Sequence, residues 1–146
     1  MEFTVMNETH VAQVAELEKL CFSDPWSLRS ITSELSNPLS LWVVAVTGDT
    51  VVGYVGSQSV MGEADMMNLA VVPEHRRQGI GRRLVEELVS RLAANQVKSL
   101  TLEVRASNDP AIALYDEMGF RAVGRRPGYY RNPKEDALIL RKEWDV

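Results

Sequence analysis

A loop rich in glycine and arginine, Arg76-Arg77-Gln78-Gly79-Ile80-Gly81, separates an expected strand from an expected amphipathic helix. The start of a helix exposes unpaired backbone N–H groups and the positive end of the helix dipole. The two glycines let the backbone approach an anion with no side chain in between. The arginines of the loop, with Arg82 directly behind it, add guanidinium donors that suit phosphate oxygens. The pattern therefore predicts a pyrophosphate site over residues 76–82.

The common nucleotide-binding motifs do not match this loop. A Walker loop requires Gly-Lys-Ser or Gly-Lys-Thr, whereas Gly81 is followed by two arginines. A dinucleotide-binding fingerprint requires a third glycine, and Leu84 stands at that position. The alternative to a ligand site is a glycine-rich helix entry with solvated arginines, so the loop alone does not identify what it binds.

The periodicity of apolar residues predicts one α/β domain that spans residues 1–146. Short turns at Gly48-Asp49 and Gly62-Glu63 join three expected strands into an antiparallel meander. The strand–helix–strand–helix–strand order that follows predicts a mixed sheet with helices on both faces. The expected strands cover residues 3–6, 41–46, 51–60, 65–72, 99–104, 120–124 and 136–142, and the expected helices end near 22, 35, 94 and 118.

Capping residues mark where the helices should start and stop. Asn7 or Thr9 can cap the first helix, and Asp24 with Pro25 at the first helical position signals the start of the second. Asn108 precedes the last helix, which a glycine at position 119 should end. Between the last two strands the chain is rich in proline, glycine and tyrosine, which predicts a loop.

The charge and composition of the chain argue against several classes of protein. A net charge of −4 argues against broad nucleic-acid binding, which requires a basic surface, and is compatible with a cationic partner. No apolar stretch approaches the ~18 residues that a membrane span needs, and the N-terminus lacks the basic and apolar segments of a secretory signal. We therefore expect a cytoplasmic protein that binds neither membranes nor nucleic acid.

Cysteine and histidine are too rare for a disulfide framework or a zinc site. Cys21 is the only cysteine, which excludes an intrachain disulfide. We expect it to be a small buried side chain, and nothing beside it in the sequence favours its thiolate, so it is not expected to act as a nucleophile. His10 and His75 lie far apart in the sequence, so no metal site is expected.

Longer stretches of the chain resemble a known family. Asn68-Leu69-Ala70-Val71-Val72-Pro73, followed by the loop at 76–81, resembles the acetyl-CoA motif of the GNAT N-acetyltransferase superfamily. One branch is matched closely, the bacterial ribosomal-protein-alanine N-acetyltransferases of the RimI type. The stretches that resemble this branch are Leu102-Glu103-Val104-Arg105-Ala106-Ser107-Asn108, Ala111-Ile112-Ala113-Leu114-Tyr115, Gly119-Phe120, Phe22-Ser23-Asp24-Pro25-Trp26-Ser27, Tyr129-Tyr130 and Glu135-Asp136-Ala137. The resemblance spans nearly the whole chain.

The resemblance implies the GNAT fold, a mostly antiparallel sheet that splays at a parallel pair of strands. In that fold the strand before the phosphate loop carries a bulge, and the pantetheine arm of acetyl-CoA enters the gap beside it. The main chain of Leu69, Ala70 and Val71 would contact this arm, and one of their N–H groups would face the thioester oxygen. Bulges re-aim backbone groups beside active sites, which makes this assignment physically sensible. Asn108 would hydrogen-bond the coenzyme, although its position also suits a helix cap.

Acetyl transfer to an amine requires a proton acceptor for the amine and a proton donor for the departing thiolate. By resemblance, Glu103 is the acceptor, and it should lie on the strand face opposite Leu102 and Val104. The alternative is a solvated Glu103, or one that pairs with Arg105 or another arginine. By resemblance, Tyr115 is the donor, within an apolar helical stripe that would orient its ring.

The acceptor amine is less constrained by the sequence. An α-amine with a pKa of ~7.8 is easier to deprotonate than a lysine at ~10.4 by roughly 3.5 kcal/mol, which suits an enzyme with one modest base. The resemblance implies the N-terminal alanine of a small-subunit ribosomal protein as substrate. Lysine side chains, polyamines or another small amine are alternatives, as is a non-catalytic acyl-CoA-binding module. Candidates for the peptide groove, each of which also has a structural explanation, are Glu34, Glu63, Asp65, Trp26, Tyr129 and Tyr130.

Overall fold

The computed structural model describes all of residues 1–146. Its strands form one seven-stranded sheet in the order β1-β2-β3-β4-β5-β7-β6. All neighbouring pairs are antiparallel except β4 and β5, which are parallel, so the predicted mixed sheet is confirmed. The strands are β1 (Glu2–Val5), β2 (Ser40–Thr47), β3 (Thr50–Val60), β4 (Glu63–Val71), β5 (Ser99–Arg105), β6 (Arg121–Tyr130) and β7 (Glu135–Glu143). The helices are α1 (Val11–Cys21), α2 (Leu28–Glu34), α3 (Ile80–Ala94) and α4 (Asp109–Glu117), with a 3-10 turn at Pro73–His75.

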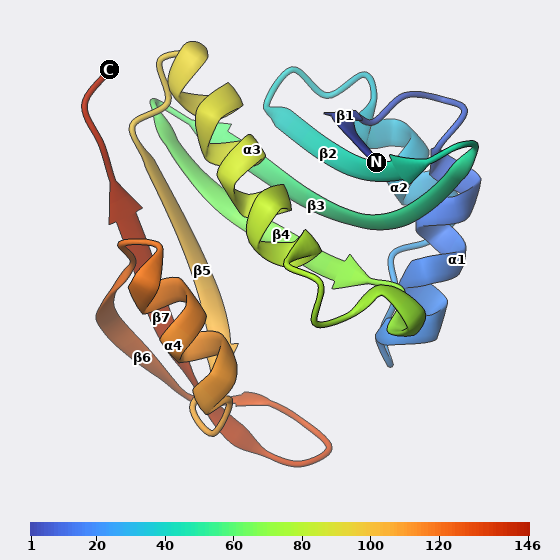
Figure 1. Ribbon diagram of the computed structural model, residues 1–146. Coiled ribbons are helices and arrows are strands. Elements are labelled where there is room, and N and C mark those ends of the chain that lie inside the picture. The colour runs from blue at the N-terminus through green and yellow to red at the C-terminus, as the bar shows by residue number, and fades with distance from the viewer.

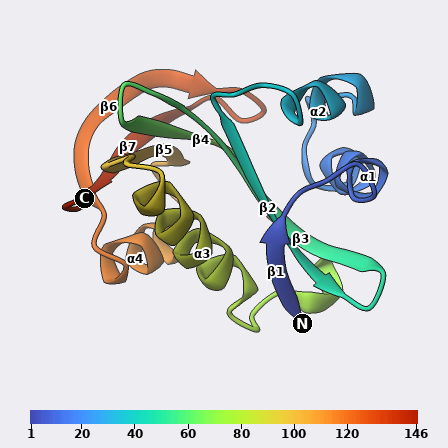
Figure 2. The same ribbon diagram turned by 90° about the horizontal axis from the view of Figure 1, so that it is seen from above.

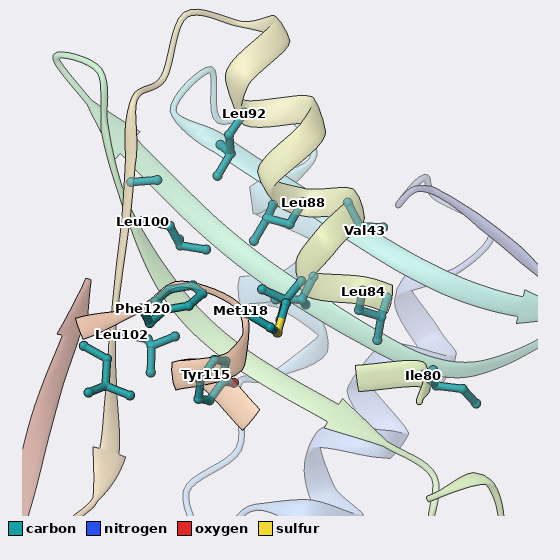
Figure 3. Close-up of a cluster of buried hydrophobic side chains, with 14 of the residues drawn as sticks. Val43, Ile80, Leu84, Leu88, Leu92, Leu100, Leu102, Tyr115, Met118 and Phe120 are labelled. Carbon is teal, nitrogen blue, oxygen red and sulfur yellow. The ribbon is translucent and has the colours of Figure 1, made fainter. Parts of the chain in front are cut away.

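Helices cover both faces of the sheet, as predicted (Figures 1 and 2). Beneath α3 and α4 lies the larger apolar core, in which Leu84 and Leu88 of α3 share one cluster with Leu100 of β5 (Figure 3). On the other face, α1 and α2 cover a second core that contains Ile31 and Tyr54. None of the helices has both the length and the apolar character that crossing a membrane requires.

The parallel strands β4 and β5 pair only at their first residues and then separate (Figure 1). Their pairing runs from Glu63 opposite Ser99 to Asp65 opposite Thr101 and goes no further. On its other edge β4 is bulged, because Val55 of β3 pairs with Leu69 whereas Ser57 pairs with Met66. The residues Met67 and Asn68 therefore stand opposite Gly56 alone. Both the bulge and the splay agree with the expectation drawn from the family resemblance.

Two predicted helix caps are wrong, because nearby polar groups are used differently. The N-cap of α1 is His10, since Asn7 instead accepts the Thr9 backbone N–H at 2.8 Å in a turn before the helix. Helix α2 begins only at Leu28, and its cap is Ser27, whose side chain accepts from the backbone of Ser30 at 3.1 Å. Asp24 and Pro25 instead belong to the irregular segment between α1 and α2.

The predicted loop between the last two strands is mostly strand, because β6 continues to Tyr130. Its pairing with β7 is irregular between Ala122 and Gly124 and again between Arg126 and Tyr130. The second irregularity accommodates the proline and glycine of this segment, which occupy an edge strand, where a missing backbone donor is tolerated. Gly128 lies there at a φ of 61°, and its N–H donates to Asp136 at 2.8 Å.

Candidate active site

A pocket of about 500 Å³ opens where β4 and β5 separate. Its walls come from the segment after α1, the bulge of β4, the end of β5, the start of α4 and the end of β6. Glu103 and Tyr115, the predicted catalytic pair, both line it. A second hollow of about 660 Å³ beside α1 contains none of the predicted site residues.

Glu103 reaches the pocket because side chains alternate along β5. Leu102 and Val104 are buried in the larger core, which leaves Glu103 on the opposite face, as predicted. Its carboxylate is a quarter exposed and accepts a hydrogen bond from the Nε of Arg126 at 3.2 Å. An arginine partner was one of the expected alternatives, although Arg105 itself bonds elsewhere, to Glu135 at 3.2 Å.

Tyr115 enters the pocket from the opposite face of the sheet. Its ring belongs to the larger core and packs edge-on against Phe120, with the ring centroids 5.3 Å apart (Figure 3). Its hydroxyl donates no hydrogen bond within the protein. Burial raises the pKa of Tyr115 to about 12, with a smaller contribution from Tyr130. The phenol therefore stays protonated throughout the neutral range and is available as a proton donor.

The N-terminus of α3 is open toward solvent, as a phosphate site requires. Its N-cap is Gly79 at a φ of 77°, and no side chain caps the helix. A Cβ added at Gly79 would meet nothing within 4 Å, and one at Gly81 would meet only Val71 at 4.0 Å. Ile80 contributes its side chain to the core, so that only its backbone is free for a ligand. The loop thus has the shape and the free N–H groups for a pyrophosphate.

The arginines around the loop differ in how they are engaged. Arg82 pairs with two glutamates on α3 and α4, the nearer at 3.2 Å. Arg76 turns back toward the sheet, where its Nε donates to the Val71 carbonyl at 3.1 Å. Arg77 and Gln78 are exposed and make no side-chain hydrogen bond or ion pair within the protein. Arg77 is therefore the arginine most readily available to an anion.

The end of β4 offers backbone groups to the same region. Leu69, Ala70 and Val71 pair with β3 on one side, and no strand pairs with them on the other because β5 has moved away. Leu69 also lines the pocket, so the unpaired edge of β4 connects the pocket to the phosphate loop. A bound arm that hydrogen-bonds to an exposed strand edge would fit here.

Asn108 caps the start of α4, which was one of the two roles expected for it. Its side chain accepts the backbone N–H of Ala111 at 3.3 Å at the start of α4, and it also lines the pocket. Its amide NH₂ group donates no hydrogen bond within the protein and is free to reach a ligand. No three His, Cys, Asp or Glu side chains lie close enough together to share a metal ion.

Known proteins resemble this chain in both sequence and structure. Residues 11–120 match the model of the acetyltransferase (GNAT) family. This chain belongs to the GNAT acetyltransferase family. The N-alpha-acetyltransferase RimI of Mycobacterium tuberculosis is 38% identical over 88% of this chain and 84% of its own length. The crystal structure of the ribosomal-protein-S18-alanine N-acetyltransferase of Escherichia coli superposes with a TM-score of 0.90 at 32% identity, over 99% of this chain and 94% of that one.

A third relative is longer than this GNAT chain. An uncharacterized protein of Mycobacterium leprae is 37% identical over 91% of this chain, which spans only 38% of that relative's length. Enzymes of the GNAT family use acetyl-CoA, and the open α3 N-terminus, the free edge of β4 and the adjoining pocket fit a pyrophosphate with an extended arm.

Only two of the six candidates for the peptide groove line the pocket. Tyr129 and Tyr130 line the pocket, whereas the three acidic candidates and Trp26 do not. Glu34, the last residue of α2, is buried, and Glu63 pairs with Arg141 at 2.7 Å. Cys21 also lies outside the pocket and is half-buried rather than buried, because it ends α1 beside an exposed arginine.

Sequence reasoning did not single out several residues that line the pocket, among them Phe22 and Asn68. These two come from the segment after α1 and from the bulge of β4. Both belong to stretches that resemble the GNAT family, and this was the only signal that could have found them. Arg126, the partner of Glu103, had no signal beyond its charge.

Proposed function

We propose that this protein transfers the acetyl group of acetyl-CoA to the N-terminal α-amine of alanine in the ribosomal protein bS18. The observation that carries the proposal is the pocket that joins Glu103, Tyr115 and the free edge of β4. Support also comes from the Escherichia coli relative, a bS18-alanine N-acetyltransferase that is 34% identical over 92% of this chain. We further propose that residues 1–146 act as one GNAT domain in the cytoplasm, because a single sheet runs through them.

The proposed mechanism is direct attack within a ternary complex. Acetyl-CoA supplies the acetyl group as a thioester. Glu103 accepts a proton from the α-ammonium, directly or through water, and the neutral amine then attacks the carbonyl carbon. A backbone N–H in the stretch from Leu69 to Val71 stabilises the oxyanion. The C–S bond then breaks as Tyr115 gives its proton to the sulfur, and the second proton of the attacking nitrogen passes through water to the tyrosinate. Cys21 lies outside the pocket, which supports direct transfer over an acylated enzyme.

The net charge of the chain suits a cationic peptide. The chain carries a net charge of −4, which favours an N-terminal peptide with a basic tail. The ammonium group of such a peptide can take the place of Arg126 beside Glu103, so that the carboxylate exchanges one cation for another. Tyr129 and Tyr130 offer aromatic surface at the same edge for the residues that follow the alanine.

Replacing Tyr115 with phenylalanine should lower kcat about 100-fold, the scale expected for the loss of a general acid. The fold should survive, because the hydroxyl makes no internal hydrogen bond and the ring still packs against Phe120. In the unmodified enzyme, the raised pKa keeps the phenol protonated, so kcat should not fall between about pH 8 and about pH 10. Steady-state kinetics across this range provide the measurement.

The matched comparison for Tyr115 is Tyr130→Phe. Tyr130 lines the same pocket, and burial, with nearby Tyr129 and Glu103, likewise raises its pKa to about 12. We expect this variant to raise KM for the peptide and to leave kcat within a few-fold of the original. A kcat loss in Tyr130→Phe alone would transfer the role of proton donor to Tyr130.

Mass spectrometry on synthetic peptides tests the proposed function. The panel carries N-terminal Ala, Ser, Gly or Met ahead of a basic tail, with one N-terminally blocked peptide that contains a free lysine. We expect acetylation of the α-amine of the alanine peptide in preference to the others. Labelling of the blocked peptide's lysine would instead support a side-chain acetyltransferase. Coenzyme binding without any product would support a non-catalytic acyl-CoA-binding module.

A further inference from the structure

Glu18 is a fully buried carboxylate that forms no ion pair. It lies on α1 and accepts hydrogen bonds from three parts of the chain. The backbone N–H of Trp26 donates at 2.8 Å, the amide of Asn68 donates to both oxygens at 3.1 and 2.9 Å, and the hydroxyl of Tyr54 is the third donor. Glu18 is thus the point at which α1 and the segment before α2 meet the paired strands β3 and β4.

Every partner of Glu18 can donate a hydrogen bond to a carboxylate oxygen. The N–H of Trp26 and the NH₂ of Asn68 can only donate, and together with Tyr54 they satisfy both oxygens. Burial of a charge without a cation is costly, while hydrogen bonds to a charged group are the strong ones and are sensitive to geometry. Glu18 therefore fixes its donors more firmly than a neutral side chain would.

One of these donors belongs to the segment that follows α1. Between Ser23 and Trp26 the chain is irregular, and the bond from Trp26 to Glu18 is the only hydrogen bond that these residues make. Phe22, at the start of the segment, lines the pocket. Glu18 thus holds the segment beside this wall by its one hydrogen bond, in addition to the packing of Trp26 against Trp42.

Another donor belongs to the opposite wall. Asn68 is part of the bulge of β4, lines the pocket, and precedes the free edge that starts at Leu69. Because a bulge can open in more than one way, the two bonds from Asn68 to Glu18 specify which backbone groups face the pocket. The same carboxylate therefore sets the distance between the segment after α1 and the bulge.

We propose that Glu18 is a positioning residue that fixes the acceptor side of the active site by joining the segment after α1 to the bulge of β4. It does not line the pocket itself, so it acts through Phe22, Asn68 and the backbone beside them. The statement that these walls form the acceptor side of the active site rests on the function proposed above. The phosphate loop lies outside the network, so the pyrophosphate contacts proposed to hold the coenzyme should not depend on Glu18.

The chain offers a matched control in Glu34. This carboxylate is also buried, forms no ion pair, and accepts only from neutral groups, among them Ser40, Trp42 and Gln58. None of its partners lines the pocket. Replacing either glutamate with glutamine removes a buried charge, but only Glu18→Gln loosens the walls of the pocket.

Kinetics of the two variants provide the first readout, at a temperature at which both are folded. Glu18→Gln should lower kcat/KM for the alanine peptide by about 10-fold to about 100-fold, the effect of a displaced active-site wall. Its Kd for acetyl-CoA should stay within a few-fold, and Glu34→Gln should keep the original kcat/KM. An unchanged kcat/KM in Glu18→Gln, or an equal fall in both variants, would assign Glu18 a structural role only.

Two further variants keep the inference testable if Glu18→Gln does not fold. Asn68→Ala removes the bonds to the bulge and leaves those from Trp26 and Tyr54, so it should lower kcat/KM in the same way. The double variant Glu18→Gln with Asn68→Asp exchanges the amide and the carboxylate, and should recover part of the lost activity. A double variant no better than the worse of its two single variants would contradict the pairing.

Hydrogen exchange measured by mass spectrometry separates this inference from the proposed function. In the coenzyme-free protein, Glu18→Gln should speed exchange over residues 23–27 and 66–69 by about 10-fold or more, and Glu34→Gln should not. If the unmodified protein acetylates no peptide, the proposed function fails and the exchange comparison still decides the role of Glu18. Exchange that is unchanged in both segments would overturn the inference.

Discussion

Acetyl-CoA binding should weaken about 100-fold when Gly79 is replaced with valine. Gly79 is the N-cap of α3, and the space around its missing Cβ is empty. A branched side chain there would cover the backbone N–H groups that are proposed to hold the pyrophosphate. The loss of two charge-assisted hydrogen bonds at about 1.5 kcal/mol each corresponds to a rise in Kd of about 100-fold. Isothermal titration calorimetry with acetyl-CoA is the direct measurement.

Backbone strain is the competing explanation, and Gly48→Val controls for it. Gly48 has a φ of 61° in the turn between β2 and β3, and a Cβ added there would also meet nothing within 4 Å. Both substitutions therefore force a branched residue into a conformation that favours glycine, at a similar cost in stability. Only Gly79→Val should lose the coenzyme. Original affinity in a folded Gly79→Val protein would remove the phosphate site from the loop.

The order of the elements could be predicted because its signals are local. Apolar alternation over residues 99–104 and the four-residue repeat of leucines in the preceding helix depend only on neighbours in the sequence. Gly48 and Gly62 mark the turns of the meander, and both have the positive φ that such turns require. The splay of β4 from β5 has no such local signal, and it was expected only from the family resemblance.

The wrong predictions concern contacts between distant parts of the chain. Asp24 and Pro25 are a good local start signal, but the next backbone N–H, of Trp26, is bound by the buried Glu18. The apolar stripe of α1 includes position 18, and no local pattern says which donors its carboxylate would find there. Pro127 likewise favours a loop when only its neighbours in the sequence are considered. The bulge that accommodates it within β6 depends on Asp136 of the next strand, which no local pattern reveals.

The residues of the candidate site could be predicted where they belong to a sequence motif. They could not be predicted where a contact between distant elements brings them to the site. Glu103 and Tyr115 lie 12 positions apart on two elements, and their meeting at one pocket follows from the splay of the sheet. The arginine that pairs with Glu103 could not be chosen from the sequence. Arg105 is its neighbour on the strand, yet Arg105 reaches Glu135 and Arg126 comes from β6 instead.

Replacing Glu103 with glutamine should lower kcat about 100-fold, the typical contribution of a general base. The amide keeps the size of the side chain but cannot take the proton of the ammonium group. Affinity for acetyl-CoA should change little, because the phosphate loop lies apart from Glu103. The measurement is kcat with the alanine peptide between about pH 6 and about pH 9, where an α-amine titrates.

The ion pair with Arg126 has to be separated from the loss of the base, because Glu103→Gln removes both. Arg126→Gln removes the same ion pair and leaves the carboxylate in place. Since the arginine is half exposed, the pair should contribute no more than about 1 kcal/mol, so this variant should keep kcat within a few-fold. If Arg126→Gln lost as much activity as Glu103→Gln, the loss in both variants would be explained by the broken ion pair and not by the missing base. If Glu103→Gln kept its original kcat across the pH range, another group or water would have to accept the proton.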